Sequence, residues 1–110
     1  MGAAYQILSK TDYFYFHLRA GNNEIILRSQ EYDSKQGCED GIDSVRVHSP
    51  YDSNYELLTS NDRQYYFNLR SANNKIIGTS ETYITIQGRD EGIESVKLNG
   101  PTAPIEDLTK

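Results

Sequence analysis

Alternation between apolar and polar side chains predicts the strands of this protein. Residues 13–19 read YFYFHLR and residues 65–70 read YYFNLR, with an aromatic or aliphatic side chain at every second position. Successive side chains of a strand point to opposite faces, so this spacing builds one buried face. Further strands are predicted before and after these two, at YQILS (5–9), YELLT (55–59) and the isoleucine pairs 25–26 and 76–77.

Short polar segments join the predicted second and third strands. They read AGNNE at 20–24 and SANNK at 71–75. Asparagine adopts positive φ at small cost, so an Asn-Asn pair favours a tight hairpin turn. The sequence therefore predicts two hairpins.

A helix of about two turns is predicted next in each half of the chain. Ser34 and Thr85 are suited to cap the helix N-termini, and Gly41 and Gly92 are suited to end the helices in the left-handed conformation. The segments SVRV (44–47) and SVKL (95–98) then predict last strands, in which Val45 and Val47 would point inward. The predicted order is β-β-β-α-β, twice.

The two halves are copies of one another. Sliding the chain by 51 positions lays residues 14–46 over 65–97 with 16 identities in 33 positions and no gap. Such self-similarity indicates an internal duplication. We predict a single domain over residues 1–98, with repeats at 5–48 and 55–98, a linker at 49–54 and a flexible C-terminal tail at 99–110.

The doubled pattern F-x-L-R…N-N-x-I-I…S…Y…G-I-x-S-V resembles the YegP-like family of small bacterial tandem-repeat proteins of unknown function. The resemblance covers residues 5–98. It implies an α+β fold in which two tandem β-β-β-α-β repeats form one mainly antiparallel sheet, with two short helices on one face and the last strands exchanged between repeats. It implies no activity. The copies depart from one another where Gly21 becomes Ala72 and Leu27 becomes Gly78.

Charge and cysteine content narrow the class of protein. The formal net charge of −5 argues against a general nucleic-acid binder. A single cysteine excludes an intramolecular disulfide and fits a reducing compartment. No signal peptide or membrane span is recognisable, so we expect a cytoplasmic bacterial protein. We also expect a monomer, because each repeat supplies the partner that the other needs.

Catalytic chemistry finds little support in the sequence. Cys38 is a candidate nucleophile, with His17 and His48 as possible bases, but the second copy has Arg89 and Asn68 at the positions of Cys38 and His17. The acidic residues of the helix segments lack the spacing of a calcium loop, and the glycines match no phosphate-binding loop. We predict no catalytic residues, no metal and no cofactor.

One surface pattern suggests binding. If the alternation holds, basic and aromatic side chains share the sheet face away from the helices: Tyr15, Arg19, Arg46, Tyr66, Arg70 and Lys97. Such a face could hold a weakly bound anionic ligand. The same residues also suit the solvent-exposed face of an ordinary antiparallel sheet. The hypotheses are thus a small binding or interaction module, a structural or stress-associated protein without a ligand, or an enzyme with an unrecognised site.

Overall fold

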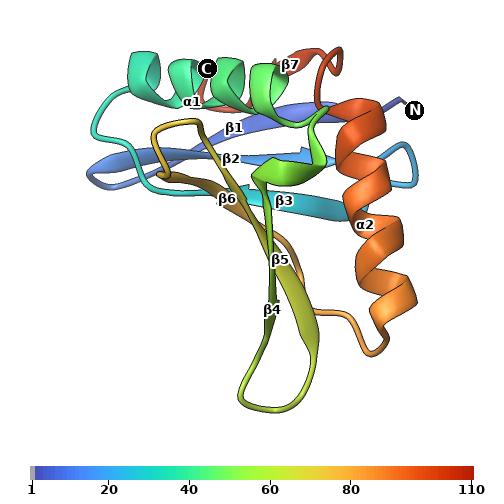
Figure 1. Ribbon diagram of the computed structural model, residues 1–110. Coiled ribbons are helices and arrows are strands. Elements are labelled where there is room, and N and C mark those ends of the chain that lie inside the picture. The colour runs from blue at the N-terminus through green and yellow to red at the C-terminus, as the bar shows by residue number, and fades with distance from the viewer. Residues whose placement is uncertain (1) are drawn as a thin grey trace.

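The computed structural model describes residues 2–110 (Figure 1). Met1, the first residue of the predicted domain, lies outside the described residues. The elements follow in the order β1 (Ala4–Lys10), β2 (Tyr13–Arg19), β3 (Ile25–Ser29), α1 (Lys35–His48), a 3-10 turn (Asp52–Asn54), β4 (Tyr55–Thr59), β5 (Tyr65–Arg70), β6 (Ile76–Thr79), α2 (Ile86–Asn99) and β7 (Ile105–Asp107).

The seven strands form one sheet in the order β4-β5-β6-β3-β2-β1-β7. All neighbouring strands are antiparallel except β1 and β7. The halves join at the short β3–β6 ladder, where Arg28 pairs with Thr79 and Ser29 with Gly78. The β4–β5 hairpin consequently runs steeply across the strands of the first half (Figure 1). The predicted α+β class and mainly antiparallel sheet are confirmed.

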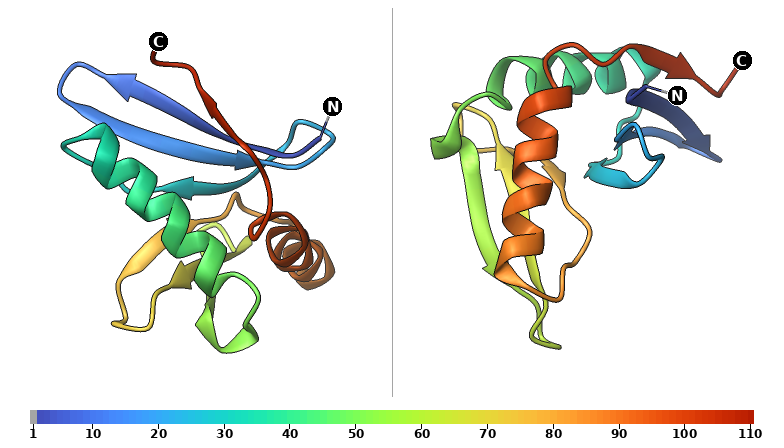
Figure 2. Two further views of the ribbon diagram at one scale, coloured as in Figure 1. Left: turned by 90° about the horizontal axis from the view of Figure 1, so that it is seen from above. Right: turned by 90° about the vertical axis from the view of Figure 1, so that its right-hand side faces the viewer.

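Both repeats contribute to the hydrophobic core. On β2 the fully buried Phe16 and Leu18 alternate with partly exposed neighbours, which confirms the predicted alternation there. On β5 Phe67 and Leu69 are fully buried, but Asn68 between them is buried as well. Helix α1 contacts β2, β5 and β6, while α2 contacts β3 and β5 (Figure 2). Each helix therefore packs against strands of both repeats, and the core depends on the two copies together.

The predicted last strands of the repeats are wrong. Residues 44–47 and 95–98 continue the helices, which have 14 residues each. Gly41 does not end α1 but lies inside it. A larger residue would not fit there, because the Tyr32 ring packs against this position: a Cβ at Gly41 would come within 2.7 Å of Tyr32 Cζ. Tyr83 and Gly92 repeat this contact. Val45 is accordingly buried, but Val47 is 63% exposed.

The helix N-terminal caps agree with the prediction. The Ser34 hydroxyl accepts a hydrogen bond from the Gly37 N–H at 3.0 Å, and the Thr85 hydroxyl accepts one from the Gly88 N–H at 2.9 Å. Both contacts satisfy backbone donors that have no partner within the first helical turn.

The C-terminal segment differs from the predicted flexible tail, because it contains β7. Ile105 lies opposite Tyr5 in a parallel ladder, and the Leu108 N–H donates to the Ile7 carbonyl at 3.0 Å. The predicted exchange of last strands does not occur, because those segments are helical. One strand does cross between the halves: β7, which follows α2, pairs with β1, whereas β4 pairs with β5 within the second repeat.

Candidate functional site

Four of the six predicted binding residues lie on strands. Tyr15 and Arg19 are in β2, and Tyr66 and Arg70 are in β5. Their neighbours Phe16 and Phe67 are buried toward the helices, so the four side chains share the opposite face of the sheet. Because β6 and β3 separate the two pairs, the face does not bring them together at one point.

Arg46 and Lys97 do not lie on the sheet face, and this part of the predicted site is corrected. Both belong to helices, since the segments that contain them are not strands. Arg46 donates to the Ala103 carbonyl at 2.9 Å and lies 5.4 Å from the centre of the Tyr5 ring. Lys97 pairs with Asp52 at 2.7 Å. Both cations therefore stabilise chain segments next to the helices.

Arg19 and Arg70 are occupied in equivalent hydrogen bonds. Arg19 donates to Gln6 Oε1 at 2.6 Å and to the Asn23 carbonyl at 2.7 Å. In the second repeat Arg70 contacts Glu56 and the Asn74 carbonyl in the same way, at 3.0 and 2.8 Å. The arginines thus tie the first strand of each repeat to the turn after the second.

The turns held by these arginines have the predicted backbone. The φ angles of Asn23 and Asn74 are 69° and 67°, in the left-handed region that asparagine tolerates. Hydrogen bonds from Asn68 and Arg70 lower the pKa of Glu56, so this carboxylate stays ionised beside its partners. Arg19 and Arg70 are therefore both engaged in hydrogen bonds within the protein.

The candidate nucleophile Cys38 lies in an environment that disfavours this role. Its side chain is fully buried, and burial raises the pKa of the thiol to about 11. The thiolate that a nucleophile requires is therefore disfavoured at neutral pH. Residues 2–110 contain no group of three or more His, Cys, Asp or Glu side chains placed to hold a metal ion. No helix within that range has the length and apolar character needed to cross a membrane.

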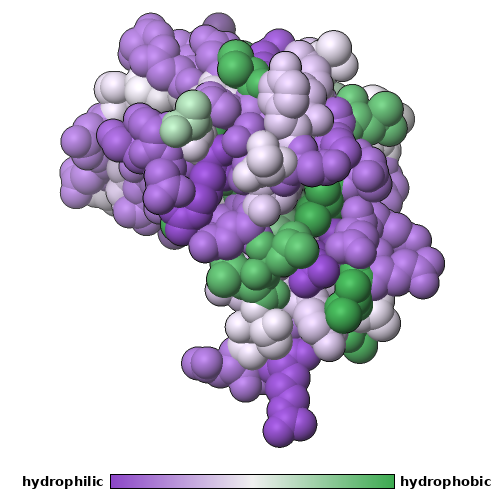
Figure 3. Space-filling model, in the orientation of Figure 1, coloured by the Kyte–Doolittle hydropathy of each residue, from purple (hydrophilic) through white to green (hydrophobic). Residues whose placement is uncertain are grey.

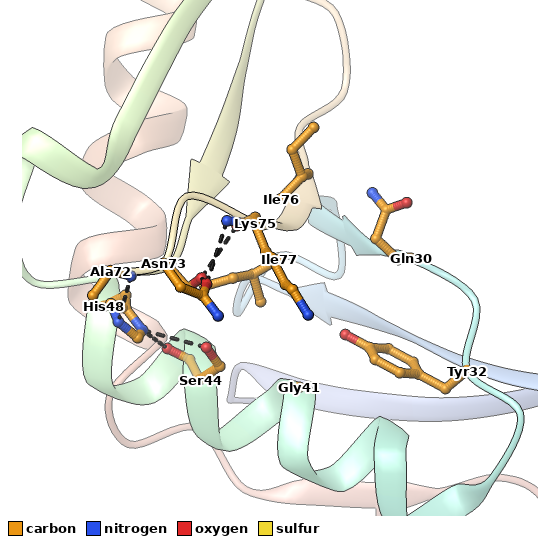
Figure 4. Close-up of a pocket in the computed structure, with 11 residues that line it drawn as sticks. Gln30, Tyr32, Gly41, Ser44, His48, Ala72, Asn73, Lys75, Ile76 and Ile77 are labelled. Carbon is orange, nitrogen blue, oxygen red and sulfur yellow. Dashed lines mark hydrogen bonds between the residues drawn. The ribbon is translucent and has the colours of Figure 1, made fainter.

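A cleft between α1 and the turn that joins β5 to β6 is a better candidate site (Figure 4). It has a volume of about 580 Å³, and we call it the lysine cleft. Its lining consists of Gln30, Tyr32, Gly41, Ser44, His48, Ser71, Ala72, Asn73, Lys75, Ile76 and Ile77. The cleft is thus built from both repeats, and its volume is within the range of small-molecule sites.

His48 fixes one wall of the lysine cleft. Its Nε2 accepts a hydrogen bond from the Ala72 N–H at 3.1 Å, and its Nδ1 lies 2.8 Å from the Ser44 carbonyl. Because Nε2 accepts, the proton of the neutral ring belongs on Nδ1, which donates to that carbonyl. This side chain bridges the end of α1 and the turn at 71–75, so it positions the wall of the cleft.

Lys75 and Tyr32 offer polar groups to a ligand in this cleft. Lys75 is exposed and forms no ion pair within residues 2–110. The Tyr32 hydroxyl points toward the Lys75 side chain across the cleft (Figure 4). Burial raises the pKa of Tyr32, so its hydroxyl stays protonated and can donate a hydrogen bond. Ile76 and Ile77 contribute apolar side chains beside them.

A smaller cleft beside the corresponding turn of the first repeat has a different charge. It is lined by Arg19, Asn23, Glu24, Ile25, Glu81, Thr82 and Tyr83, and its volume is about 370 Å³. Tyr83 corresponds to Tyr32, but Glu24 stands in place of Lys75. We call it the glutamate cleft. The two repeats have therefore diverged in the sign of the charge at this position of the turn.

Sequence reasoning did not identify the lysine cleft, although part of its signal was present. Tyr32 and Tyr83 are identical between the repeats, and Lys75 against Glu24 is a change of sign inside an otherwise repeated turn. Neither feature indicates a cleft until α1 is extended to His48 and placed beside that turn.

The fold and the paired clefts define a tandem-repeat α+β protein with one sheet shared by both repeats. The chain belongs to the family described as a domain of unknown function, DUF1508, whose sequence model matches it twice, at residues 9–56 and 60–107. It is 48% identical over 101 residues to the UPF0339 protein YegP of Escherichia coli K12, with 92% of each chain covered. A UPF0339 protein of Acinetobacter baylyi is 49% identical over 110 residues, with 99% of each chain covered.

Two solved structures share the fold. The solution NMR structure of the E. coli protein of unknown function yegP superposes with a TM-score of 0.91 at 44% identity, covering 98% of this chain and 94% of that one. A UPF0339 protein from Shewanella oneidensis gives a TM-score of 0.91 at 42% identity, covering 98% and 92%. The relatives are uncharacterised, so they add a fold and a family but no activity.

Proposed function

We propose that this protein is a binding module whose lysine cleft holds a small ligand with an apolar body and one anionic group. The observation that carries the proposal is the ammonium of Lys75, which forms no ion pair within residues 2–110, at a preformed cleft that also presents Ile76 and Ile77. Small-molecule sites typically combine apolar walls with few polar groups that fix orientation. The ligand's anionic group would pair with Lys75 and accept a hydrogen bond from the Tyr32 hydroxyl, while its apolar part would contact Ile76 and Ile77.

A titration with octanoate, followed by NMR amide shifts, tests this proposal. Octanoate combines an alkyl chain with a carboxylate. We expect saturable shifts at Gln30, Ser44, Lys75, Ile76 and Ile77. Octylamine has the same chain and the opposite charge, so it should bind at least tenfold more weakly at the same residues.

Two matched charge substitutions test whether Lys75 binds the carboxylate of octanoate. Lys75→Glu gives the lysine cleft the residue of the glutamate cleft and should weaken octanoate binding at least tenfold. Glu24→Lys makes the converse change in the other half and should leave binding to the lysine cleft unchanged. Shifts that are absent, or equal in wild type and Lys75→Glu, would refute the proposal.

We further propose that the two repeats act as a single domain and that the chain is a cytoplasmic monomer. The shared core supports the single domain and the monomer, because each helix packs on strands of both repeats and needs no second chain. The free thiol of Cys38 supports a reducing compartment. Light scattering that gives about 25 kDa, twice the 12.5 kDa of one chain, would contradict the monomer.

A further inference from the structure

The first strands of the two repeats differ in whether another strand covers their outer side. β1 and β4 are equivalent first strands of the two repeats, and each pairs with the strand that follows it. β1 is additionally covered by β7 on its other side, whereas β4 is the last strand of the sheet. Outer strands present backbone N–H and C=O groups that another chain can pair with.

The β1–β7 contact shows what such an edge accepts. Within this ladder Glu106 lies opposite Gln6 and accepts its amide hydrogen bond at 2.9 Å. Asp107 lies opposite Ile7 and reaches across to Lys35 at the start of α1, also at 2.9 Å. Each of these two β7 side chains therefore has a specific partner: one on the outer face of the sheet and one toward the helix.

The same positions around β4 carry different chemistry. Glu56 replaces Gln6, Leu57 replaces Ile7 and Ile86 replaces Lys35. Ile7 is fully buried, but Leu57 and Ile86 are 54% and 51% exposed. Figure 3 shows apolar side chains gathered over the β4–β5 hairpin and between it and α2. This edge thus combines an unpaired strand, exposed aliphatic groups and the Glu56 carboxylate. Within residues 2–110, Asn68 and Arg70 bind only Oε1 of that carboxylate, so Oε2 is left for a partner.

We propose that the β4 edge docks an extended segment of a partner protein, parallel to β4, with a basic residue opposite Glu56 and a large aliphatic residue opposite Leu57. The basic side chain would take the place of Glu106 and pair with the Glu56 carboxylate. The aliphatic side chain would take the place of Asp107, where Ile86 instead of Lys35 now faces it. Backbone hydrogen bonds to Leu57 would mirror the bond that Ile7 receives from Leu108.

A second copy of this chain fits the edge poorly. Its own strand of this kind, β7, would place Glu106 against Glu56, and like charges directly opposite each other destabilise strand pairing. Asp107 would likewise meet Ile86 and bury a carboxylate without a cation. The charge pattern therefore favours a segment with a basic residue over β7 of a second copy.

Two peptides built on β7 test the proposal. One has the sequence of residues 101–109, and the other is the same peptide with Glu106→Lys and Asp107→Leu. We expect the modified peptide to bind the full chain at least tenfold more tightly, with NMR shifts at Glu56, Leu57 and Ile86 and slower amide exchange at Leu57. Binding should weaken as salt screens the Glu56 contact.

A variant of the full chain provides the reciprocal test. Glu56→Gln gives β4 the residue of β1, and Gln6 shows that glutamine still accepts the arginine hydrogen bond there. We expect this variant to lose at least half of the preference for the modified peptide while keeping its fold. Equal binding of both peptides, shifts away from β4, or shifts at β4 that depend on protein concentration without peptide would overturn the proposal, the last by showing that a second copy covers the edge.

Discussion

The junction between the repeats shows why two residues had to diverge. Leu27 and Gly78 are equivalent, and both lie beside the β3–β6 ladder that joins the halves. A Cβ at Gly78 would lie 2.7 Å from Leu27 Cγ. Leucine in both copies would therefore place two side chains in the space for one. Glycine at position 78 leaves room for the Leu27 side chain, so the two repeats differ at this position.

Substitution at this junction should reveal the coupling. Gly78→Ala should lower the free energy of unfolding by about 1–3 kcal/mol, because an added methyl overpacks a filled core. In a Leu27→Ala background the same change should cost less or stabilise, since the methyl then enters the vacated space. Urea unfolding measures both, with Gly2→Ala as a control because no atom lies within 4 Å of its added Cβ. Strictly additive effects would contradict this account.

At the scale of elements, the sequence predicts the hairpins and strands better than the helix ends. Aromatic alternation and the Asn-Asn turns are local features, and the structure confirms them. The helix ends depend on tertiary contacts: Gly41 costs about 1 kcal/mol relative to alanine in a helix, yet it admits the Tyr32 ring. Segment 44–47 is rich in valine and imitates a strand, although Ile42, Val45 and Ser49 are buried at helical spacing.

The docking of β7 should depend on pH through Asp107. Hydrogen bonds from Thr109 and Lys35 lower the pKa of this carboxyl, so the fold favours its ionised form. The resulting stabilisation is fully present above about pH 4, the usual pKa of aspartate, and is lost as pH falls below it. Asp107→Asn should therefore speed exchange of the Leu108 amide near pH 7, after correction for intrinsic exchange, and this effect should shrink steadily as pH falls below about 4.

Lys35→Met provides the partner control for this contact. It should weaken β7 docking near neutral pH in the same direction as Asp107→Asn, because it removes the cation that pairs with Asp107. A Leu108 amide whose protection is unchanged by both substitutions would show that β7 is held without this ion pair.

At the scale of the whole molecule, neither repeat is complete alone. A cut after Ser53 would separate β1 from β7 and β3 from β6, and would remove each helix from strands that it covers. We predict that residues 1–53 and 54–110, produced separately, give poorly dispersed amide spectra, and that mixing them restores dispersion. A separate half with a dispersed spectrum and a monomeric mass would contradict this.

The sequence could not have predicted the candidate site. Arg19 and Arg70 are basic residues on a strand, and nothing local shows that Gln6, Glu56 and the turn carbonyls already occupy them. The lysine cleft arises only from the packing of α1 against a turn of the other repeat. The spacing of apolar residues along the chain does not reveal such contacts between residues that are far apart in the sequence.

Intermolecular NOEs between octanoate and the protein test the central claim most directly, because they place the ligand rather than merely detect it. The account predicts NOEs from the alkyl chain to the methyl groups of Ile76 and Ile77, with the carbon next to the carboxylate close to the Lys75 side chain. NOEs to the exposed side chains Ile84, Ile86 and Leu98 instead, or to Ile25 in the glutamate cleft, would contradict it.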